Sequence, residues 1–128
     1  MKVSDLIKES ISIEDTADAR QVFKDWTFIK RISFGFTDID RFFEKYFSNG
    51  KVELVDISLL KPHHDWGRRP ESENPPIIMR LKNSELVILD GQHRVLAAKD
   101  KGKTDIQCYV FDAPIRYSKP TKKYLVDE

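Results

Sequence analysis

The segment VILDGQHRVLAA, residues 87–98, constrains the fold of this chain more than any other stretch of the sequence. Residues 86–89 form a short apolar run, which is typical of a buried strand. The dipeptide Asp90-Gly91 then predicts a tight turn, and residues 92–101 have the composition of a helix that Gly102 ends. A strand, a turn and a helix are therefore predicted in this order.

The start of the predicted helix is suited to binding an anion. The first backbone N–H groups of a helix have no partner within the helix, and the helix dipole adds positive potential there. Gly91 has no Cβ that would keep an anion away from the backbone. Arg94 can present a bidentate fork to a phosphate, and His93 offers a second donor when protonated. Gly91, Gln92, His93 and Arg94 are therefore the candidate phosphate-binding residues.

The same residues have a purely structural interpretation. Asp90 then caps the helix, Gly91 makes the turn, and His93 and Arg94 lie on the surface. Short glycine motifs often occur by chance, so the local pattern leaves both interpretations open.

The remaining chain reads as helices followed by strands, with one more helix before the last strand. Residues 28–36 are predicted as a strand or an extended connector, Thr37 as a helix cap, and Asn49-Gly50 as a helix end suited to positive φ. Residues from Ala113 onward are predicted to be loosely attached. The expected helices cover residues 3–7, 17–26, 38–46 and 92–101, and the expected strands cover residues 51–57, 77–81, 85–89 and 106–111. This order predicts an α+β fold.

Composition limits the class of protein. The chain has 128 residues, the size of one ordinary domain, with 22 basic and 21 acidic residues. This balance argues against a protein that coats nucleic acid through bulk charge, although it is compatible with a local basic patch. A lone cysteine, Cys108, excludes an intramolecular disulfide, as expected in a reducing compartment. Because the sequence has no signal-peptide core and no run of about 18 apolar residues, we expect a cytoplasmic protein without a membrane segment.

Residues 76–112 resemble the ParB/sulfiredoxin superfamily. That superfamily has a strand of the type P-I-x-V, a hairpin, a G-x-x-R box, a helix with two alanines and a glycine, and a final strand. The matching residues here are Pro76-Ile77-Ile78, Gly91-Gln92-His93-Arg94, Ala97-Ala98, Gly102 and residues 106–110. A second box of the superfamily resembles Val55-Asp56-Ile57, Leu60-Lys61-Pro62 and Arg68-Arg69. The resemblance covers residues 52–112 and leaves out residues 1–50.

This resemblance implies a small ParB/sulfiredoxin-like core over residues 51–112, with a mixed sheet and packed helices. A helical extension over residues 1–50 precedes the core, and a tail over residues 113–128 follows it. The resemblance also implies that residues 91–94 bind phosphates of a nucleotide or of nucleic acid. Lys61 and either Arg68 or Arg69 would close on the phosphates from the second box.

Two differences from the superfamily pattern narrow the range of expected activities. Sulfiredoxins carry a cysteine where this chain has Gln92, and Cys108 lies on the last predicted strand, away from the helix start. Repair of sulfinic acids is therefore not expected. Partition proteins of the superfamily have a long helical region after their first box, whereas only residues 70–75 separate box and strand here. A full partition protein is not expected either.

Phosphoryl chemistry needs a proton acceptor near the nucleophile and cations on the phosphates. The superfamily includes a kinase acting on free serine, in which a loop glutamate takes this role. Asp90 is the first candidate here, Glu71 is the second, and His93 is a further candidate for moving a proton.

Two features of the loop over residues 62–76 have alternative interpretations. Trp66 lies among cations and can stack on a base or a ribose, or can instead hold the loop to the core. The pair His63-His64 with Asp65 lacks a further ligand at a typical spacing, so no metal site is predicted from these residues.

The sequence thus predicts a domain that binds a nucleoside phosphate or a nucleic-acid phosphate and carries out phosphoryl transfer or phosphate-ester hydrolysis, as an NTPase, a small kinase or a nuclease. The expected cofactor is a nucleotide (ATP, ADP or CTP) with Mg²⁺. The alternative is a non-catalytic regulatory module that responds to a nucleotide or to DNA. In that case the aromatic N-terminal helices would contact a protein partner or a second copy of the chain. A third interpretation is a domain that keeps the fold and has lost its ligand.

Overall fold

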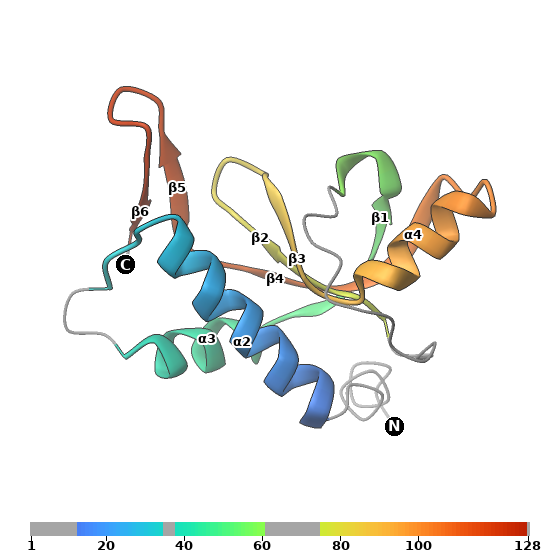
Figure 1. The fold of residues 1–128 in the computed structure, drawn as a ribbon, viewed down its shortest axis with the longest axis horizontal. Coiled ribbons are helices and arrows are strands. Elements are labelled where there is room, and N and C mark those ends of the chain that lie inside the picture. The colour runs from blue at the N-terminus through green and yellow to red at the C-terminus, as the bar shows by residue number, and fades with distance from the viewer. Residues whose placement is uncertain (1–12, 35–37, 61–74, 128) are drawn as a thin grey trace.

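The computed structural model describes residues 13–34, 38–60 and 75–127 (Figure 1). The fold is α+β, as the sequence predicts, and its described part holds one mixed four-stranded sheet and one two-stranded sheet. The elements are α2 (Ile13–Ile29), α3 (Ile39–Phe47), β1 (Lys51–Asp56), the short 3-10 helix η1 (Ile57–Leu59), β2 (Ile77–Arg80), β3 (Leu86–Asp90), α4 (Gln92–Asp100), β4 (Asp105–Asp112), β5 (Ile115–Ser118) and β6 (Lys123–Val126).

The strand order β1-β4-β2-β3 places the long strand β4 inside the four-stranded sheet. Strand β4 pairs antiparallel with β1, with Lys51 opposite Val110, and parallel with β2, with Ile77 opposite Tyr109. Strands β2 and β3 form the predicted antiparallel hairpin. Because parallel strands need a crossover connection, the chain passes from this hairpin through α4 to reach β4.

Successive residues of the inner strands point alternately into two separate cores. The core beneath α2 and α3 takes in Ile77, Met79, Val87, Leu89, Tyr109 and Phe111. The core beneath α4 takes in Ile78, Ile88, Cys108 and Val110, with Val95 and Ala98 from the helix. The sheet is therefore the middle of three layers.

Aromatic residues of the N-terminal helices are part of the core. Phe23 and Trp26 of α2 and Phe42 and Phe43 of α3 are at most 6% exposed, and they belong to the same core as the sheet residues. The rings of Phe23 and Phe42 are stacked with centroids 5.8 Å apart. These helices therefore share a core with the sheet.

Helix α2 is longer than predicted. It continues to Ile29, whereas residues 28–36 were expected to be extended. The buried side chains of Ala19, Phe23 and Trp26 recur every three or four residues along one face of the helix, so contact with the sheet supports it over this length. The burial of Trp26 and Thr27 holds the last turn of α2 against the core, whereas Phe28 and Ile29 are exposed.

The end of α2 is a Schellman motif. The Ile32 N–H donates to the Thr27 carbonyl at 2.9 Å, and the Arg31 N–H donates to the Phe28 carbonyl at 3.1 Å. Arg31 occupies the left-handed position of this motif, with φ 56°. Because arginine stands where glycine is usual, the sequence carries no conventional helix-stop signal here.

Helix α3 begins one residue later than predicted. Its N-cap is Asp38, whose carboxylate accepts from the Asp40 N–H at 2.8 Å. The expected cap, Thr37, lies outside the described residues. Aspartate and threonine are both good N-cap residues, so the sequence pattern alone does not separate them.

Gly50 follows the end of α3 as predicted, but for a different reason. Its φ is not among the positive values, so backbone freedom does not explain the glycine. A Cβ at this position would lie 2.5 Å from ring atoms of Tyr109. The Tyr109 hydroxyl also donates to the Phe47 carbonyl. Gly50 therefore provides space for a tyrosine of β4.

The prediction that the chain is loosely attached from Ala113 onward is wrong. Strands β5 and β6 form an antiparallel hairpin that begins at a fully buried residue, Ile115. The Lys82 N–H donates to the Ile115 carbonyl, and the ring of Tyr124 packs edge-on against Trp26 with centroids 5.3 Å apart. Contacts with residues that are distant in the sequence therefore fix the hairpin at its base.

Candidate functional site

The predicted strand–turn–helix arrangement is confirmed. Strand β3 ends at Asp90, and α4 begins at Gln92, so Gln92, His93 and Arg94 form the first helical turn. Gly91 lies between the two elements as the N-cap residue, in the left-handed region at φ 88°. Asp90 therefore lies one residue before the N-cap.

Gly91 is required for two independent reasons. Its positive φ costs a residue with a Cβ about 1–2 kcal/mol. In addition, a Cβ here would lie 2.8 Å from Cα and 2.9 Å from Cβ of Pro76. Pro76 is itself held in the sheet, since its carbonyl accepts from the Tyr109 N–H at 2.8 Å. The turn is therefore tightly constrained by the adjacent strand.

The first turn of α4 is anchored on one side and accessible on the other. The N–H groups of Arg94 and Val95 both donate to the Gly91 carbonyl, at 3.1 and 3.2 Å. The side chain of Val95 is buried in the core beneath α4, whereas those of Gln92 and His93 are half-buried. The amides of Gln92 and His93 precede the first hydrogen bond within the helix, which is where helix termini bind anions.

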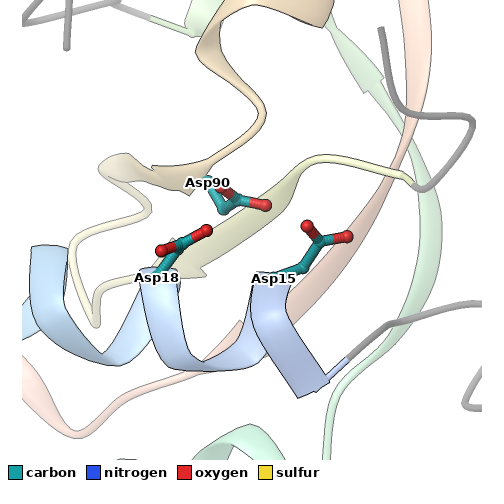
Figure 2. A group of neighbouring side chains, drawn as sticks. All are labelled: Asp15, Asp18 and Asp90. Atoms are coloured by element: carbon teal, nitrogen blue, oxygen red, sulfur yellow. The ribbon is translucent and has the colours of Figure 1, made fainter. Parts of the chain in front are cut away.

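Three carboxylates gather beside this turn (Figure 2). One oxygen each from Asp15, Asp18 and Asp90 lies within 4.8 Å of the other two, and all three residues are half-buried. Asp15 and Asp18 come from the start of α2, three residues apart on one face of the helix, and Asp90 comes from the end of β3. Carboxylate oxygens are the ligands that Mg²⁺ and Ca²⁺ prefer.

Asp15 and Asp18 are candidate site residues that the sequence did not reveal. In the sequence, Asp15 is only a helix-cap candidate, and acidic residues in a first helical turn stabilise the helix dipole without any ligand. Their spacing of three residues predicts a shared helix face. Only the packing of α2 against β3 brings that face to Asp90.

The part of the second box from Lys61 onward lies outside the described residues, whereas Val55-Asp56-Ile57 lies at the end of β1 and the start of η1. This applies to the predicted phosphate-binding residues Lys61, Arg68 and Arg69, to the stacking candidate Trp66 and to the base candidate Glu71. It also applies to His63, His64 and Asp65. Closure of this box over the α4 turn therefore stays a prediction.

Cys108 is buried in β4, in the core beneath α4. Burial raises the pKa of its thiol to about 12, because the low-dielectric core disfavours the thiolate. A nucleophilic role for this cysteine is therefore excluded by both access and ionisation.

We expect Cys108 to resist thiol reagents in the native protein. Only the thiolate reacts, and a pKa of about 12 leaves roughly one thiol in ten thousand ionised at pH 8. An aromatic disulfide reagent should label the native chain more than about 100-fold more slowly than the chain in denaturant. The raised pKa also means that this group stabilises the fold fully below pH 9 and that the contribution is lost as the pH rises toward 12. Rapid labelling at pH 8 without unfolding would contradict this burial.

Among the described residues, no helix is both long and apolar enough to cross a membrane.

Comparison with models of protein families, with curated proteins and with solved structures found no match to this chain. The ParB/sulfiredoxin resemblance therefore remains a prediction from the residues.

Proposed function

We propose that this chain binds the Mg²⁺ complex of a nucleoside phosphate at the start of α4 and transfers or hydrolyses its phosphate ester. The observation that carries the proposal is the position of three carboxylates next to a glycine turn that opens a helix. A helix N-terminus favours phosphate, and a carboxylate cluster favours a divalent cation. A metal–phosphate complex supplies both the anion for the helix start and the cation for the carboxylates.

The phosphate part of the proposal rests on the turn itself. Gly91 presents its backbone without a side chain, and the amides of Gln92 and His93 lie in the first turn of α4. Arg94 lies in the same turn and can add a bidentate fork. These are the groups predicted from the sequence, and their common location supports the prediction.

The carboxylates argue for the metal complex over the bare phosphate. Carboxylate oxygens that lie within 4.8 Å of one another repel, by about 3 kcal/mol per pair at that limit and an effective dielectric constant of 20 if no neighbouring cation compensates, and an added phosphate would increase the repulsion. A bound Mg²⁺ reverses the sign of this interaction for Asp15, Asp18 and Asp90. It would also present a phosphate oxygen to the helix start, as in other phosphate-transfer sites.

The proposed roles of the acidic residues follow from this geometry. Asp90 would hold the cation together with Asp15 and Asp18. The proton of the attacking water or hydroxyl would then pass to His93 in the first turn of α4 or to Glu71, which follows the second box in the sequence. Lys61, Arg68 and Arg69 would neutralise the outer phosphates, and Trp66 would stack on the base.

A thermal-shift titration tests the binding step. ATP, ADP and CTP are each added with and without Mg²⁺, and we expect stabilisation only when both nucleotide and metal are present. A ligand at 100 times its Kd adds about 2.7 kcal/mol to the free energy of unfolding. Asp90→Asn should abolish this stabilisation because it removes one metal ligand.

Asp100→Asn is the matched control, since Asp100 is exposed at the other end of α4 and the charge change is the same. The control should retain the full shift. A nucleotide shift that is independent of both Mg²⁺ and Asp90 would refute the metal-complex proposal.

Arg94→Lys is expected to weaken nucleotide binding about ten- to a hundredfold. Lysine keeps the charge but loses the bidentate geometry, and a charge-assisted hydrogen bond is worth roughly 1.5–3 kcal/mol. Calorimetric titration of Arg94→Lys and Arg94→Ala, alongside their melting curves, measures the effect. A lower melting temperature with unchanged affinity would instead assign Arg94 a structural role.

Release of inorganic phosphate separates catalysis from binding. Incubation of ATP or CTP with Mg²⁺ and the protein should release phosphate, and Asp90→Asn should not. Saturating binding without any release or transfer would support the non-catalytic alternative, a nucleotide-responsive regulatory module.

A further inference from the structure

The hairpin of β5 and β6 projects from the body of the protein at the end opposite α4 (Figure 1). The two strands pair with Tyr117 opposite Tyr124 and Ser118 opposite Lys123, and residues 119–122 connect them. Opposite residues share a face, so the tyrosine pair lies on the same face as buried Ile115. The other face and the turn point away from the core.

The outward side of this hairpin is basic. Arg116, Lys119, Lys122 and Lys123 are all exposed, and the described part of the hairpin contains a single acidic residue, Asp127. Asp127 pairs with Arg116 at 2.8 Å. Within the described residues, the three lysines form no ion pair. The whole chain carries a net charge of only +1, so this charge is concentrated locally.

A further lysine lies on the tyrosine side of the hairpin, at the end of α2. Lys30 follows the last residue of that helix, and its Nζ lies 5.5 Å from the centroid of the Tyr124 ring. Lys30 and its neighbour Arg31 are both exposed. We call the surface formed by Arg116, Lys119, Lys122 and Lys123 the basic ribbon.

The turn keeps its charge at a conformational cost. Lys122 has φ 54°, in the left-handed region where glycine or asparagine is favoured. A glycine there would relax the backbone and remove the charge together. A charged residue at such a position points to a functional constraint on the turn.

The basic ribbon is held rigidly. The Tyr124 hydroxyl donates to the Glu85 carboxylate at 2.9 Å, and its ring contacts both Trp26 and Tyr117. The Asp127 N–H donates to the Pro114 carbonyl at the base. Because the base is fixed, the position of the two strands relative to the rest of the protein is set before a partner binds.

We propose that the basic ribbon binds the phosphate backbone of duplex DNA. A two-stranded ribbon is narrow enough to enter the major groove of B-form DNA, and lysines at its tip and outer face can then contact phosphates on both sides. The turn residues Lys119, Pro120, Thr121 and Lys122 include no large apolar side chain that would insert into a lipid bilayer. This surface is separate from the proposed nucleotide site and does not depend on it.

Fluorescence anisotropy with a labelled 20-base-pair duplex of random sequence, at 50 and 200 mM salt, tests the proposal. The variant Lys119→Gln/Lys122→Asn/Lys123→Gln should bind at least tenfold more weakly at 50 mM salt. The slope of log K against log salt should become less negative by about 1 for each lysine removed. The matched control Lys99→Gln/Lys101→Gln/Lys103→Gln removes three exposed charges at the end of α4 and should bind within twofold of wild type.

The single variant Lys122→Gly separates binding from stability. The melting temperature should rise by about 3–6 °C because the left-handed strain is relieved. DNA affinity should fall nevertheless, with the salt slope reduced by about 1. A purely structural role of the turn would leave DNA affinity unchanged.

Three results would overturn the proposal. They are unchanged affinity in the triple lysine variant, an equal loss in the α4 control, and tighter binding to vesicles of anionic phospholipid than to DNA. Failure of the nucleotide proposal would give a different set of results from failure of the DNA proposal. Asp90→Asn should keep wild-type DNA binding, and the triple hairpin variant should keep any Mg²⁺-dependent nucleotide shift.

Discussion

Replacing Gly91 with alanine is expected to lower the free energy of unfolding by about 2–5 kcal/mol. The left-handed backbone accounts for about 1–2 kcal/mol. Overlap with Pro76 adds about 1–3 kcal/mol, because the closest atom, 2.8 Å from the new Cβ, belongs to the backbone and cannot rotate away. Urea denaturation of both proteins measures the difference.

Gly102→Ala is the matched control for this prediction. Gly102 also has a positive φ, 76°, but no atom lies within 4 Å of an added Cβ. Its alanine variant should therefore lose only the backbone contribution of about 1–2 kcal/mol. Equal losses at the two positions would mean that Pro76, immediately before β2, shifts to accommodate the new methyl group. A loss of nucleotide binding in Gly91→Ala but not in Gly102→Ala would support the proposed site.

Replacing Phe23 with alanine is expected to cost about 3–5 kcal/mol, the range for a large buried aromatic residue. Phe23 is fully buried between rings from the two neighbouring segments. Its centroid lies 5.8 Å from that of Phe42, 5.6 Å from that of Phe43 and 6.0 Å from that of Phe34. The substitution leaves a cavity that this cluster cannot fill without moving α2.

Phe28 provides the control on the same helix. It is 84% exposed, so Phe28→Ala should change stability by less than about 0.5 kcal/mol. Similar losses for the two variants would contradict the orientation of α2. Because α2 also carries Asp15 and Asp18, Phe23→Ala should weaken the Mg²⁺ dependence of nucleotide binding, whereas Phe28→Ala should not.

Local pattern was sufficient to predict the turn at Gly91 and the end of α4. The apolar run of β3, the dipeptide Asp90-Gly91 and the later Gly102 each act within a few residues, so neighbouring positions determine their structure. Gly102 occupies the left-handed position, with the Lys103 N–H donating to the Ala98 carbonyl at 3.0 Å. The inner strands, whose side chains point alternately into the two cores, could also be predicted from the sequence, because both of their faces are apolar.

Features that depend on distant contacts could not be predicted. The attachment of the β5–β6 hairpin depends on contacts such as that of Tyr124 with Trp26, which lies about 100 residues earlier in the chain. The proximity of Asp15 and Asp18 to Asp90 likewise depends on the packing of α2 against β3. The space needed by Tyr109 explains Gly50, and no pattern around Gly50 indicates that need.

The strand order β1-β4-β2-β3 has a consequence for how the chain folds as it is synthesised. Within the part of the chain that the structure describes, β1 pairs with β4 alone, so the strand of Lys51 has no partner until Val110 has been synthesised. At a synthesis rate of about 5–20 residues per second, that wait lasts several seconds. The β2–β3 hairpin, whose partners are close in sequence, can form much earlier. During the interval β1 exposes an unpaired edge, and the chain is most prone to aggregate at this stage of its synthesis.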